Sequence, residues 1–409
     1  MTRLLALTSR VPYSTTEEAF VQDELEMLKH QGMDLIVVPA RVTSGGPNPA
    51  AVASGLADVT VGETLASPTV LRGALGTLAR HPIRSIAGIF AVLSRAGGLR
   101  NFATNFAVIP KALWLAGLVA ERRVTHIHAY WLGHTATAAL VASRISSVPW
   151  SATGYRWDID AKNAIGPKVR EAQFLRVADE LGERQLTDLA SRLATHPAPI
   201  ELIRTGVALP APAAREAREP DAGVLCCAAA FVPKKGHAVL IDAFADLVGQ
   251  GRAMHLHLFG QGPLLSDVTA AVKVRGLVDQ VTFHGVVPLA ELRAFLLDRR
   301  PVVVLPSITA EDGQQEGIPV VLIEAMAAGC PVVSTRTGSI PSLVLDGCGW
   351  LVDGGDSVGL SRAIQSVADD PAATQSVTKA AAGRVTGQFE LGATAAQLAG
   401  LIRRDGSRP

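Results

Sequence analysis

Residues 306–344, PSITAEDGQQEGIPVVLIEAMAAGCPVVSTRTGSIPSLV, carry the clearest signs of the fold in this sequence. The apolar run at residues 302–305 comes just before them and predicts a buried strand. Residues 320–328 have the length and apolar character of a buried helix, and residues 331–334 predict the next strand. Because strands that alternate with helices form parallel sheets, this region predicts an α/β fold.

The same alternation runs along the chain in two series. The first series predicts strands at residues 3–7, 34–39, 124–130, 149–153 and 201–204. The second series predicts strands at residues 224–229, 255–259, 281–283, 302–305 and 331–334. The polar segment APAAREAREPDA, residues 211–222, separates the series and is typical of a linker. We therefore predict two doubly wound α/β domains, at residues 1–206 and 223–390, with a linker at 207–222 and a terminal helix within 391–409.

The composition excludes several classes of protein. The chain has 409 residues, of which 48% are hydrophobic and 18% are charged, so it is not mainly disordered. Its formal net charge is +1, and nothing in this overall charge indicates a nucleic-acid partner. The four cysteines, at positions 226, 227, 330 and 348, have no metal-ligand spacing. We expect buried, reduced thiols, as in a cytosolic protein.

The apolar segments do not predict a membrane span. The N-terminal sequence MTRLLALTSRVP has too short an apolar run for a signal peptide. The nearest candidate for a spanning helix, residues 102–120, contains Asn105, Pro110 and Lys111. We therefore expect a cytoplasmic protein.

Residues 64–120 contain no Asp or Glu but six basic residues, which are Arg72, Arg80, Arg84, Arg95, Arg100 and Lys111. Apolar residues recur there at helical spacing, at Ile83, Ile86, Ile89, Phe90 and Leu93. One interpretation is an amphipathic helix whose apolar side packs on the domain and whose basic side faces solvent. The other is a basic amphipathic surface that contacts anionic lipid or a pyrophosphate-bearing acceptor.

The clearest chemical signal is a pair of glutamates, Glu316 and Glu324, separated by seven residues. Pro319 lies between them and suits the first helical turn, because it has no N–H to lose. The amides of residues 320–322 would then lie unpaired at the positive end of a helix, which favours an anion. Glu324 could accept hydrogen bonds from a diol such as a ribose, and Glu316 could accept them from sugar hydroxyls.

Two further turns come directly after predicted strands. In PKKGH, residues 233–237, Lys235 is placed to neutralise a phosphate. In FGQGP, residues 259–263, Gly260 and Gly262 would let the backbone approach a ligand closely. Each segment also has a purely structural interpretation. PKKGH could be a surface turn and FGQGP a tight turn. The two glutamates could be a capping residue and a surface charge. Because ligands bind outside the carboxyl ends of strands in open α/β sheets, three such turns together favour a binding site.

These segments resemble the retaining nucleotide-sugar glycosyltransferases of family 4, which have the GT-B fold. Residues 316–338 resemble the E-x7-E signature of that family, and PKKGH, GQGP, VTFHGVVP (281–288) and TGSIPSLV (337–344) match it in the expected order. SRVPYSTTEEAF (9–20) and HIHAYWLGHTATAALVASR (126–144) resemble exopolysaccharide or colanic-acid-type members. The resemblance implies two Rossmann-like domains that face a central cleft. The terminal helix would cross back to the N-terminal, acceptor-binding domain.

The resemblance also implies roles for individual residues. Glu324 would hold the ribose of the nucleotide, Glu316 would contact hydroxyls of the donor sugar, and Lys235 would bind the diphosphate. Backbone groups would complete the donor site at Gly262, Val286, Gly317, Ile318, Val320 and Val321. Enzymes of this family are usually metal-independent, so we expect neither a metal nor a cofactor.

The sequence departs from the family pattern in both domains. Ala230 stands where the family usually has a phosphate-binding arginine. Tyr155 and Tyr130 stand where relatives have histidines, the first of them near the reaction centre, and tyrosine is a poor base at neutral pH. Arg156 could supply the lost positive charge and is a candidate catalytic residue with Tyr155, or it could be a surface arginine. These changes suggest an atypical acceptor, an altered donor or lost activity.

The prediction that combines these features is a retaining, metal-independent glycosyltransferase. It would move a sugar from a nucleotide diphosphate sugar to a glycan, a lipid-linked oligosaccharide or a specialised metabolite. The alternatives are a non-catalytic nucleotide-sugar-binding paralogue, transfer to a nitrogen or sulfur nucleophile in natural-product biosynthesis, and an epimerase or phosphorylase of the same fold. We expect no nucleic-acid partner, and we expect a peripheral contact with the inner face of the membrane.

Overall fold

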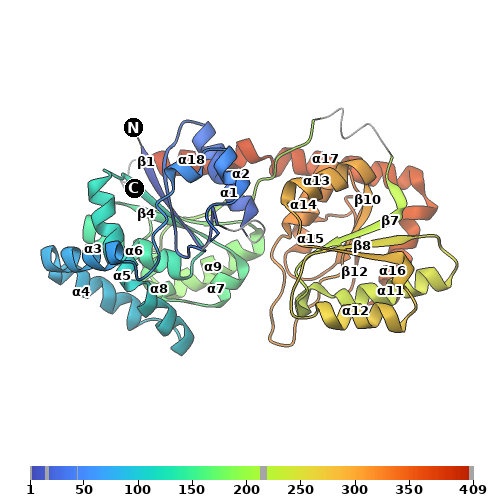
Figure 1. Ribbon diagram of the computed structural model, residues 1–409, viewed down its shortest axis with the longest axis horizontal. Coiled ribbons are helices and arrows are strands. Elements are labelled where there is room, and N and C mark those ends of the chain that lie inside the picture. The colour runs from blue at the N-terminus through green and yellow to red at the C-terminus, as the bar shows by residue number, and fades with distance from the viewer. Residues whose placement is uncertain (1, 14–17, 44, 212–218, 405–409) are drawn as a thin grey trace. The chain divides into compact units, whose positions relative to one another are not determined.

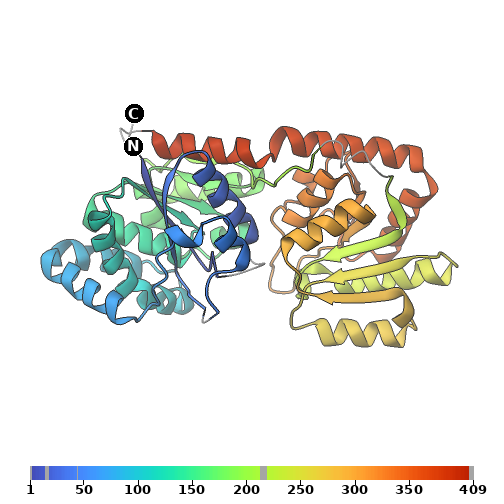
Figure 2. The same ribbon diagram turned by 45° about the horizontal axis from the view of Figure 1, so that its top comes forward.

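The computed structural model describes residues 2–13, 18–43, 45–211 and 219–404. The chain divides into two compact units, each with its own buried core and its own six-stranded sheet (Figures 1 and 2). Unit 1 consists of Met1–Arg204 and Gly392–Pro409, and unit 2 consists of Thr205–Leu391. The terminal helix, α18 (Leu391–Arg403), therefore packs with unit 1.

The sheet of unit 1 is parallel throughout, with the strand order β2-β1-β3-β4-β5-β6. Its strands are β1 (Arg3–Thr8), β2 (Asp34–Pro39), β3 (His126–Tyr130), β4 (Trp150–Gly154), β5 (Leu175–Val177) and β6 (Ile200–Leu202). Its helices before α18 are α1 (Ala19–His30), α2 (Pro49–Ala53), α3 (Pro68–Arg80), α4 (Pro82–Leu93), α5 (Leu99–Glu121), α6 (His134–Ser146), α7 (Arg156–Asp160), α8 (Ile165–Glu171) and α9 (Glu180–Leu193). This order is that of a doubly wound α/β domain.

The central strand β3 is buried although it contains two histidines. His126 shares a hydrogen bond of 2.7 Å with the Ser151 hydroxyl on the neighbouring strand β4. The two ring nitrogens of His128 lie 2.8 Å and 2.9 Å from the hydroxyls of Ser151 and Thr153. Burial lowers the pKa of His126 to about 3, so the ring is neutral and its hydrogen bonds offset the cost of leaving water.

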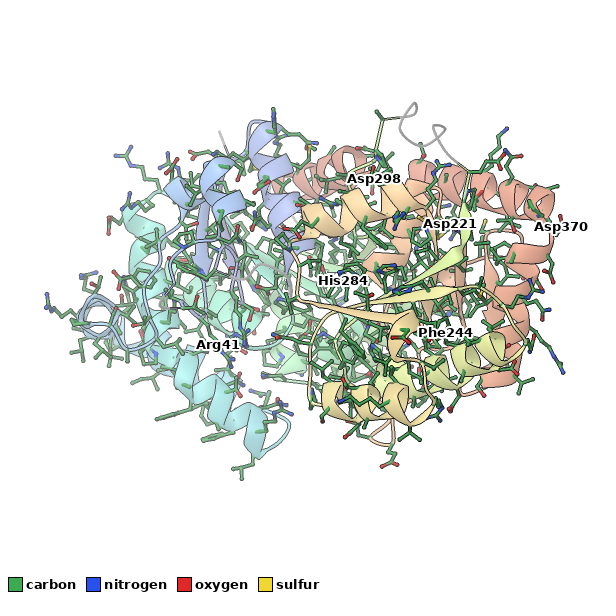
Figure 3. All side chains as sticks on the ribbon, turned by 45° about the vertical axis from the view of Figure 1, so that its right-hand side comes forward. Arg41, Asp221, Phe244, His284, Asp298 and Asp370 are labelled. Atoms are coloured by element: carbon green, nitrogen blue, oxygen red, sulfur yellow. The ribbon has the colours of Figure 1, made fainter. Side chains whose placement is uncertain are left out.

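The sheet of unit 2 is also parallel, with the strand order β12-β11-β10-β7-β8-β9. Its strands are β7 (Asp221–Ala228), β8 (His255–Phe259), β9 (Val281–Gly285), β10 (Pro301–Leu305), β11 (Val332–Thr335) and β12 (Trp350–Val352). Its helices are α11 (His237–Gly249), α12 (Leu265–Val274), α13 (Leu289–Arg299), α14 (Val320–Ala328), α15 (Ile340–Leu343), α16 (Ser357–Asp369) and α17 (Pro371–Gln388). Phe244 of α11 is fully buried in the core of this unit (Figure 3).

The linker predicted at residues 207–222 is only partly a linker. Val207 is buried and pairs with Glu390 in an isolated parallel bridge, and β7 already begins at Asp221. Residues 212–218, in the middle of this prediction, lie outside the described residues. The polar composition of the segment therefore indicated the boundary between the units but not its limits.

The first interpretation of residues 64–120, an amphipathic helix whose apolar side packs on the domain, is partly wrong. Ile89 and Leu93 of α4 pack against the core of unit 1, as expected. Ile83, Ile86 and Phe90 of the same helix are instead exposed. The inner side of α4 also contains Gly88, where an added Cβ would lie 3.5 Å from Val141 of α6, so the two helices lie close together.

One described helix, α5, is long and apolar enough to cross a membrane, with a mean hydropathy of 1.5 over its most apolar window. Of that window, 61% is buried inside the protein. Lys111, near its middle, is 2% exposed, and its ammonium donates to the carbonyl oxygens of Pro39 and Glu63. These contacts are those of a core helix.

Candidate functional site

The predicted donor-site residues gather at one edge of the sheet of unit 2. The loops after β7, β8, β9, β10 and β11 begin at this edge, because the strands are parallel and their carboxyl ends meet there. The loop after β7 contains Lys235, and the long loop after β10 contains Glu316 and leads into α14 with Glu324. The structure thus brings together segments that are separated by more than 80 residues in the sequence.

Glu316 forms the centre of a charge cluster. Its side chain is only 6% exposed and lies 2.9 Å from the Lys235 ammonium and 3.2 Å from the Lys234 ammonium. Burial by itself would raise the pKa of Glu316, but the two lysines outweigh burial and hold the pKa below its ordinary value. Glu316 is therefore a carboxylate at neutral pH, and the cluster of three side chains carries one net positive charge.

Two glycines allow the loops of this cluster to pack closely on each other. Gly236 has φ +68°, and a Cβ atom there would lie 1.9 Å from the carbonyl oxygen of Pro306. Gly338 has φ +58°, and a Cβ atom there would lie 2.0 Å from the carbonyl oxygen of Glu316. The amide of Ser339 donates to the same Glu316 oxygen at 3.1 Å. The position of the Glu316 backbone therefore depends on the absence of a side chain at residue 338.

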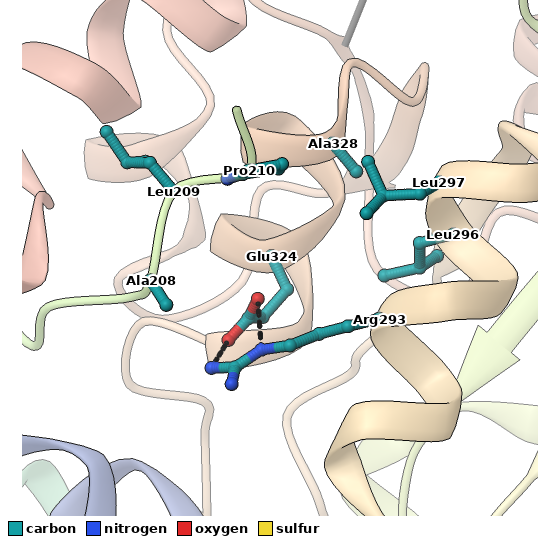
Figure 4. A pocket seen from close by; sticks show the side chains of 8 residues that line it. All are labelled: Ala208, Leu209, Pro210, Arg293, Leu296, Leu297, Glu324 and Ala328. Atoms are coloured by element: carbon teal, nitrogen blue, oxygen red, sulfur yellow. Dashed lines mark hydrogen bonds and ion pairs between the residues drawn. The ribbon is translucent and has the colours of Figure 1, made fainter. Parts of the chain in front are cut away.

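Glu324 is buried on α14 and is bound by an arginine from the neighbouring helix α13. Arg293 donates to both carboxylate oxygens of Glu324, at 2.6 Å and 3.0 Å (Figure 4). This two-bonded geometry fixes the orientation of the carboxylate. The pair faces a pocket of about 170 Å³, also lined by Ala208, Leu209, Pro210, Leu296, Leu297 and Ala328.

The start of α14 differs from the prediction by one position. Pro319 is the N-cap residue and the helix begins at Val320. The amide of Leu322 donates to the carbonyl oxygen of Pro319 at 3.0 Å, so this amide is not available to an anion as expected. Val320 and Val321 form the first turn, and their side chains pack against the core. Their amides therefore lie at the positive end of the helix.

The glycines after β8 have a structural role that the sequence did not show. A Cβ atom at Gly260 would lie 2.1 Å from the carbonyl oxygen of Ala229, and one at Gly262 would lie 2.6 Å from that of Phe231. These glycines let the loops after β7 and β8 pack on each other, which explains them without a ligand. Val286, after β9, is 42% exposed.

Two residues of the site were missed in the sequence. Lys234 stands next to Lys235, and the pair of adjacent lysines was the available signal. Arg293 is 31 residues from Glu324 and lies in no motif, so only the packing of α13 on α14 reveals it. Ala230, where the family has an arginine, is exposed at the same edge. Lys234 brings a second cation to this cluster.

Tyr155 and Arg156 lie in unit 1, after β4, where α7 begins. The Tyr155 ring packs against Phe20 and Trp131, and its centroid lies 5.6 Å and 4.6 Å from the centroids of those two rings. Arg156 is 8% exposed, so the alternative of a surface arginine is wrong. Tyr130 is buried, and its hydroxyl donates to the Glu24 carboxylate at 2.7 Å.

Among the described residues, no group of three or more His, Cys, Asp or Glu side chains is arranged to hold a metal ion. Cys226, Cys227 and Cys330 are buried free thiols. Burial raises the pKa of Cys227 to about 12, so this thiol is protonated. The positive charge at the site edge comes from lysines and an arginine.

Comparison with known proteins identifies the domain that carries these residues. Residues 213–384 match the family model described as glycosyl transferases group 1. This region is a group 1 glycosyltransferase domain. The amylovoran biosynthesis glycosyltransferase AmsK of Erwinia amylovora is 36% identical to it over 177 residues, and the putative colanic acid biosynthesis glycosyltransferase WcaL of Salmonella typhimurium is 38% identical over 177 residues. Each alignment covers 43% of this chain and 43% of the relative, so the match spans less than half of these relatives.

Solved structures extend the comparison from the glycosyltransferase domain to the fold of both units. The crystal structure of Anabaena HepE in complex with UDP and glucose superposes with a TM-score of 0.69 and 18% sequence identity. The superposition covers 98% of this chain and 99% of HepE. The likeness confirms the predicted fold class, which is GT-B with two doubly wound α/β domains.

Proposed function

We propose that the chain is a retaining glycosyltransferase that uses a nucleotide diphosphate sugar as donor. The observation that carries this proposal is the cluster of Glu316 with Lys234 and Lys235, beside the start of α14. Cations and helix amides next to a carboxylate that can accept hydroxyl hydrogen bonds suit a sugar joined to a diphosphate. The group 1 glycosyltransferase domain supports the same chemistry.

In this proposal, the lysines exchange partners when the donor binds. Before binding, both ammonium groups contact the Glu316 carboxylate, which keeps them ordered at the site edge. The diphosphate oxygens would attract Lys234 and Lys235, and hydroxyls of the sugar would donate to Glu316. As the bond between sugar and phosphate breaks, negative charge grows on the leaving diphosphate, and these cations stabilise it.

The pair of Glu324 and Arg293 would receive the nucleoside. Glu324 is the group that we propose to accept hydrogen bonds from the two ribose hydroxyls. Arg293 orients the carboxylate through its two hydrogen bonds. The pocket of about 170 Å³ is smaller than a typical ligand pocket, and it would hold only this part of the donor.

Retention and independence of metal are part of the proposal. The lysines and the amides of Val320 and Val321 supply positive charge of the kind that a metal ion supplies elsewhere. The leaving diphosphate would take the proton from the acceptor on the same face of the sugar. Tyr155 is fixed in an aromatic cluster and is a poor base at neutral pH, which agrees with proton transfer to phosphate.

For the acceptor, we propose a glycan or a lipid-linked oligosaccharide. AmsK and WcaL are named for the biosynthesis of amylovoran and colanic acid, and this supports a polysaccharide product. The alternative is a metabolite acceptor in natural-product biosynthesis. A screen that offers the enzyme both kinds of acceptor would distinguish the two.

The first test is binding of a nucleotide panel, UDP, GDP, ADP, CDP and dTDP, measured by thermal unfolding. A nucleotide at 100 times its dissociation constant adds about 2.7 kcal/mol to stability. We expect one nucleotide to stabilise the chain and Glu324→Gln to remove this effect. Glu291→Gln, on the exposed side of α13, is the matched control and should keep it. Stabilisation by none of the five would contradict the donor site.

The second test is release of the nucleoside diphosphate from the donor that the panel selects. Loss of an electrostatic contact to the leaving group costs about 100-fold in kcat, so Lys235→Ala should be at least that much slower. The control is Lys273→Ala, on the exposed part of α12. If the chain binds the nucleotide but does not release nucleoside diphosphate from the donor, the alternative of a non-catalytic nucleotide-sugar-binding paralogue would be favoured.

A further inference from the structure

Three consecutive helices of unit 1 turn large apolar side chains to the outside. They are α3, α4 and α5, which contact one another and gather at one margin of the unit (Figures 1 and 2). The exposed side chains form what we call the apolar face: Leu71, Leu75, Ile83, Ile86, Phe90, Leu99, Phe102 and Phe106. Single exposed apolar residues are common, but eight on three helices that contact one another are typical of an interaction surface.

Helix α4 shows the arrangement most clearly. Ile83, Ile86 and Phe90 are 83%, 62% and 67% exposed, and their spacing places them on one side of the helix. The opposite side contains Ser85, Gly88 and Val92, which are buried. Helix α4 thus has apolar residues on both sides, because Val92 is buried and Ile89 and Leu93 pack against the core. An ordinary surface helix has polar residues on its outer side, where α4 has Ile83, Ile86 and Phe90.

Helix α5 repeats this arrangement in its first half. Leu99, Phe102 and Phe106 are 85%, 42% and 63% exposed and have the same helical spacing. Asn105, between them in sequence, is completely buried and donates to the Asn163 side chain at 2.8 Å. The inner side of this helix is therefore fixed by specific contacts, and its apolar side remains outside.

The charges of this region have one sign. No Asp or Glu occurs between residues 64 and 120. Lys111 is used inside the unit, whereas the arginines of these helices and their connection are exposed, at Arg72, Arg80, Arg84, Arg95 and Arg100. Within residues 64–120 the apolar face is therefore accompanied by cations only, which favours a partner that is apolar and bears negative charge.

We propose that the apolar face binds the surface of a bilayer that contains anionic lipids. The phenylalanine, isoleucine and leucine side chains would enter the boundary between headgroups and acyl chains, and the arginines would contact lipid phosphates. A second copy of this chain fits less well, because pairing two identical faces would bring their arginines together. The helices lie on the membrane in this arrangement, and α5 does not cross it, since most of its apolar window is buried.

The test uses the full chain and vesicles collected by sedimentation. Vesicles of phosphatidylcholine mixed with phosphatidylglycerol should bind the protein, and phosphatidylcholine alone should bind it far less. Each phenylalanine contributes about tenfold to the partition coefficient, so Phe90→Gln with Phe106→Gln should weaken binding about 100-fold. Each arginine contributes about fivefold, so Arg95→Gln with Arg100→Gln should weaken it about 25-fold, and high salt should have a similar effect.

Controls separate this surface from general stickiness and from unfolding. Val274→Gln with Val278→Gln changes two exposed apolar residues of unit 2, and binding to vesicles should not change. The phenylalanine and arginine variants should keep the melting temperature and the nucleotide binding of the parent chain, because the altered side chains are exposed.

Three results would overturn the proposal. One is absence of binding to the anionic vesicles, and another is an equal loss in the Val274 and Val278 variant. The third is a dimer in sedimentation velocity that the phenylalanine variant dissociates while vesicles bind neither protein, which would assign the face to a second copy. None of these results bears on the donor site, because the test of that site measures nucleotide binding by unit 2.

Discussion

The charge cluster around Glu316 makes a prediction that requires no knowledge of the substrate. Lys235→Met removes an ammonium that lies 2.9 Å from a carboxylate with a 6% exposed side chain. Breaking a fully buried ion pair costs about 3–5 kcal/mol, and losing one charged hydrogen bond costs about 1.5–3 kcal/mol. Because Lys234 remains at 3.2 Å and Lys235 is itself 16% exposed, we expect about 2 kcal/mol.

The assay is a double-mutant cycle with Lys235→Met, Glu316→Gln and the double variant. Scanning calorimetry would give the free energy of unfolding for the transition of unit 2, because a chain of two units need not unfold in one step. At pH 7 the coupling energy between the two positions should be about 2 kcal/mol. A control cycle on Arg336 and Asp353, which are mostly exposed and 3.7 Å apart, should give at most about 0.5 kcal/mol.

The dependence on pH has a definite sign. The folded-state pKa of Glu316 lies below its ordinary value of 4.5. Its ionised form therefore contributes stability that is fully present above pH 4.5 and is lost as the pH falls through the folded-state pKa. The coupling with Lys235 should shrink in the same range. A coupling below 0.5 kcal/mol at pH 7, or one that grows on acidification, would refute this account of the cluster.

Two further variants test the supports of the site. Arg293→Leu leaves the buried carboxylate of Glu324 without its two hydrogen bonds, so nucleotide affinity should fall at least about tenfold, measured by titration calorimetry. Gly338→Ala places a methyl group 2.0 Å from the Glu316 carbonyl oxygen at φ +58°, so the loop must move. We expect a loss of more than about 2 kcal/mol in stability and a matching fall in donor turnover.

Each of these variants has a matched control in the same unit. Arg299→Leu changes an exposed arginine at the end of α13 and should leave nucleotide affinity unchanged. Gly383→Ala lies in α17, where the added carbon would meet nothing within 4 Å outside the adjacent backbone of its own helix, and it should stabilise the helix by up to about 1 kcal/mol. If a variant and its control had equal effects, Arg293 and Gly338 would have no specific role in supporting the site.

The sequence predicted most of the parallel sheets because their strands are continuous apolar runs. Buried strands such as β10 are apolar at every position, and this is visible without a partner. The three-residue strands β5 and β12 were missed, although β6, which is equally short, was predicted. In β5 the middle residue is Arg176, whose charge is compensated by Glu24, at 2.7 Å in the structure and 152 positions away in the sequence.

In the site, too, local patterns predicted individual residues but not the contacts between them. Glu316 and Lys235 were both predicted, since each follows a strand and the strand ends meet at one edge of the sheet. That they bind each other, with Lys234 as a third partner, depends on the close packing of the loops at Gly236 and Gly338. No local pattern reveals such packing.

By itself, the sequence determined that the chain forms two α/β domains, that residues 83–93 have the spacing of an amphipathic helix, and that residues 64–120 contain no acidic residue. These properties follow from the period and composition of neighbouring residues. Only the tertiary structure decided which side of α4 is buried, because the period of a helix does not depend on where its neighbours lie. It also decided that Arg293 holds Glu324, because a contact between two helices depends on how they pack.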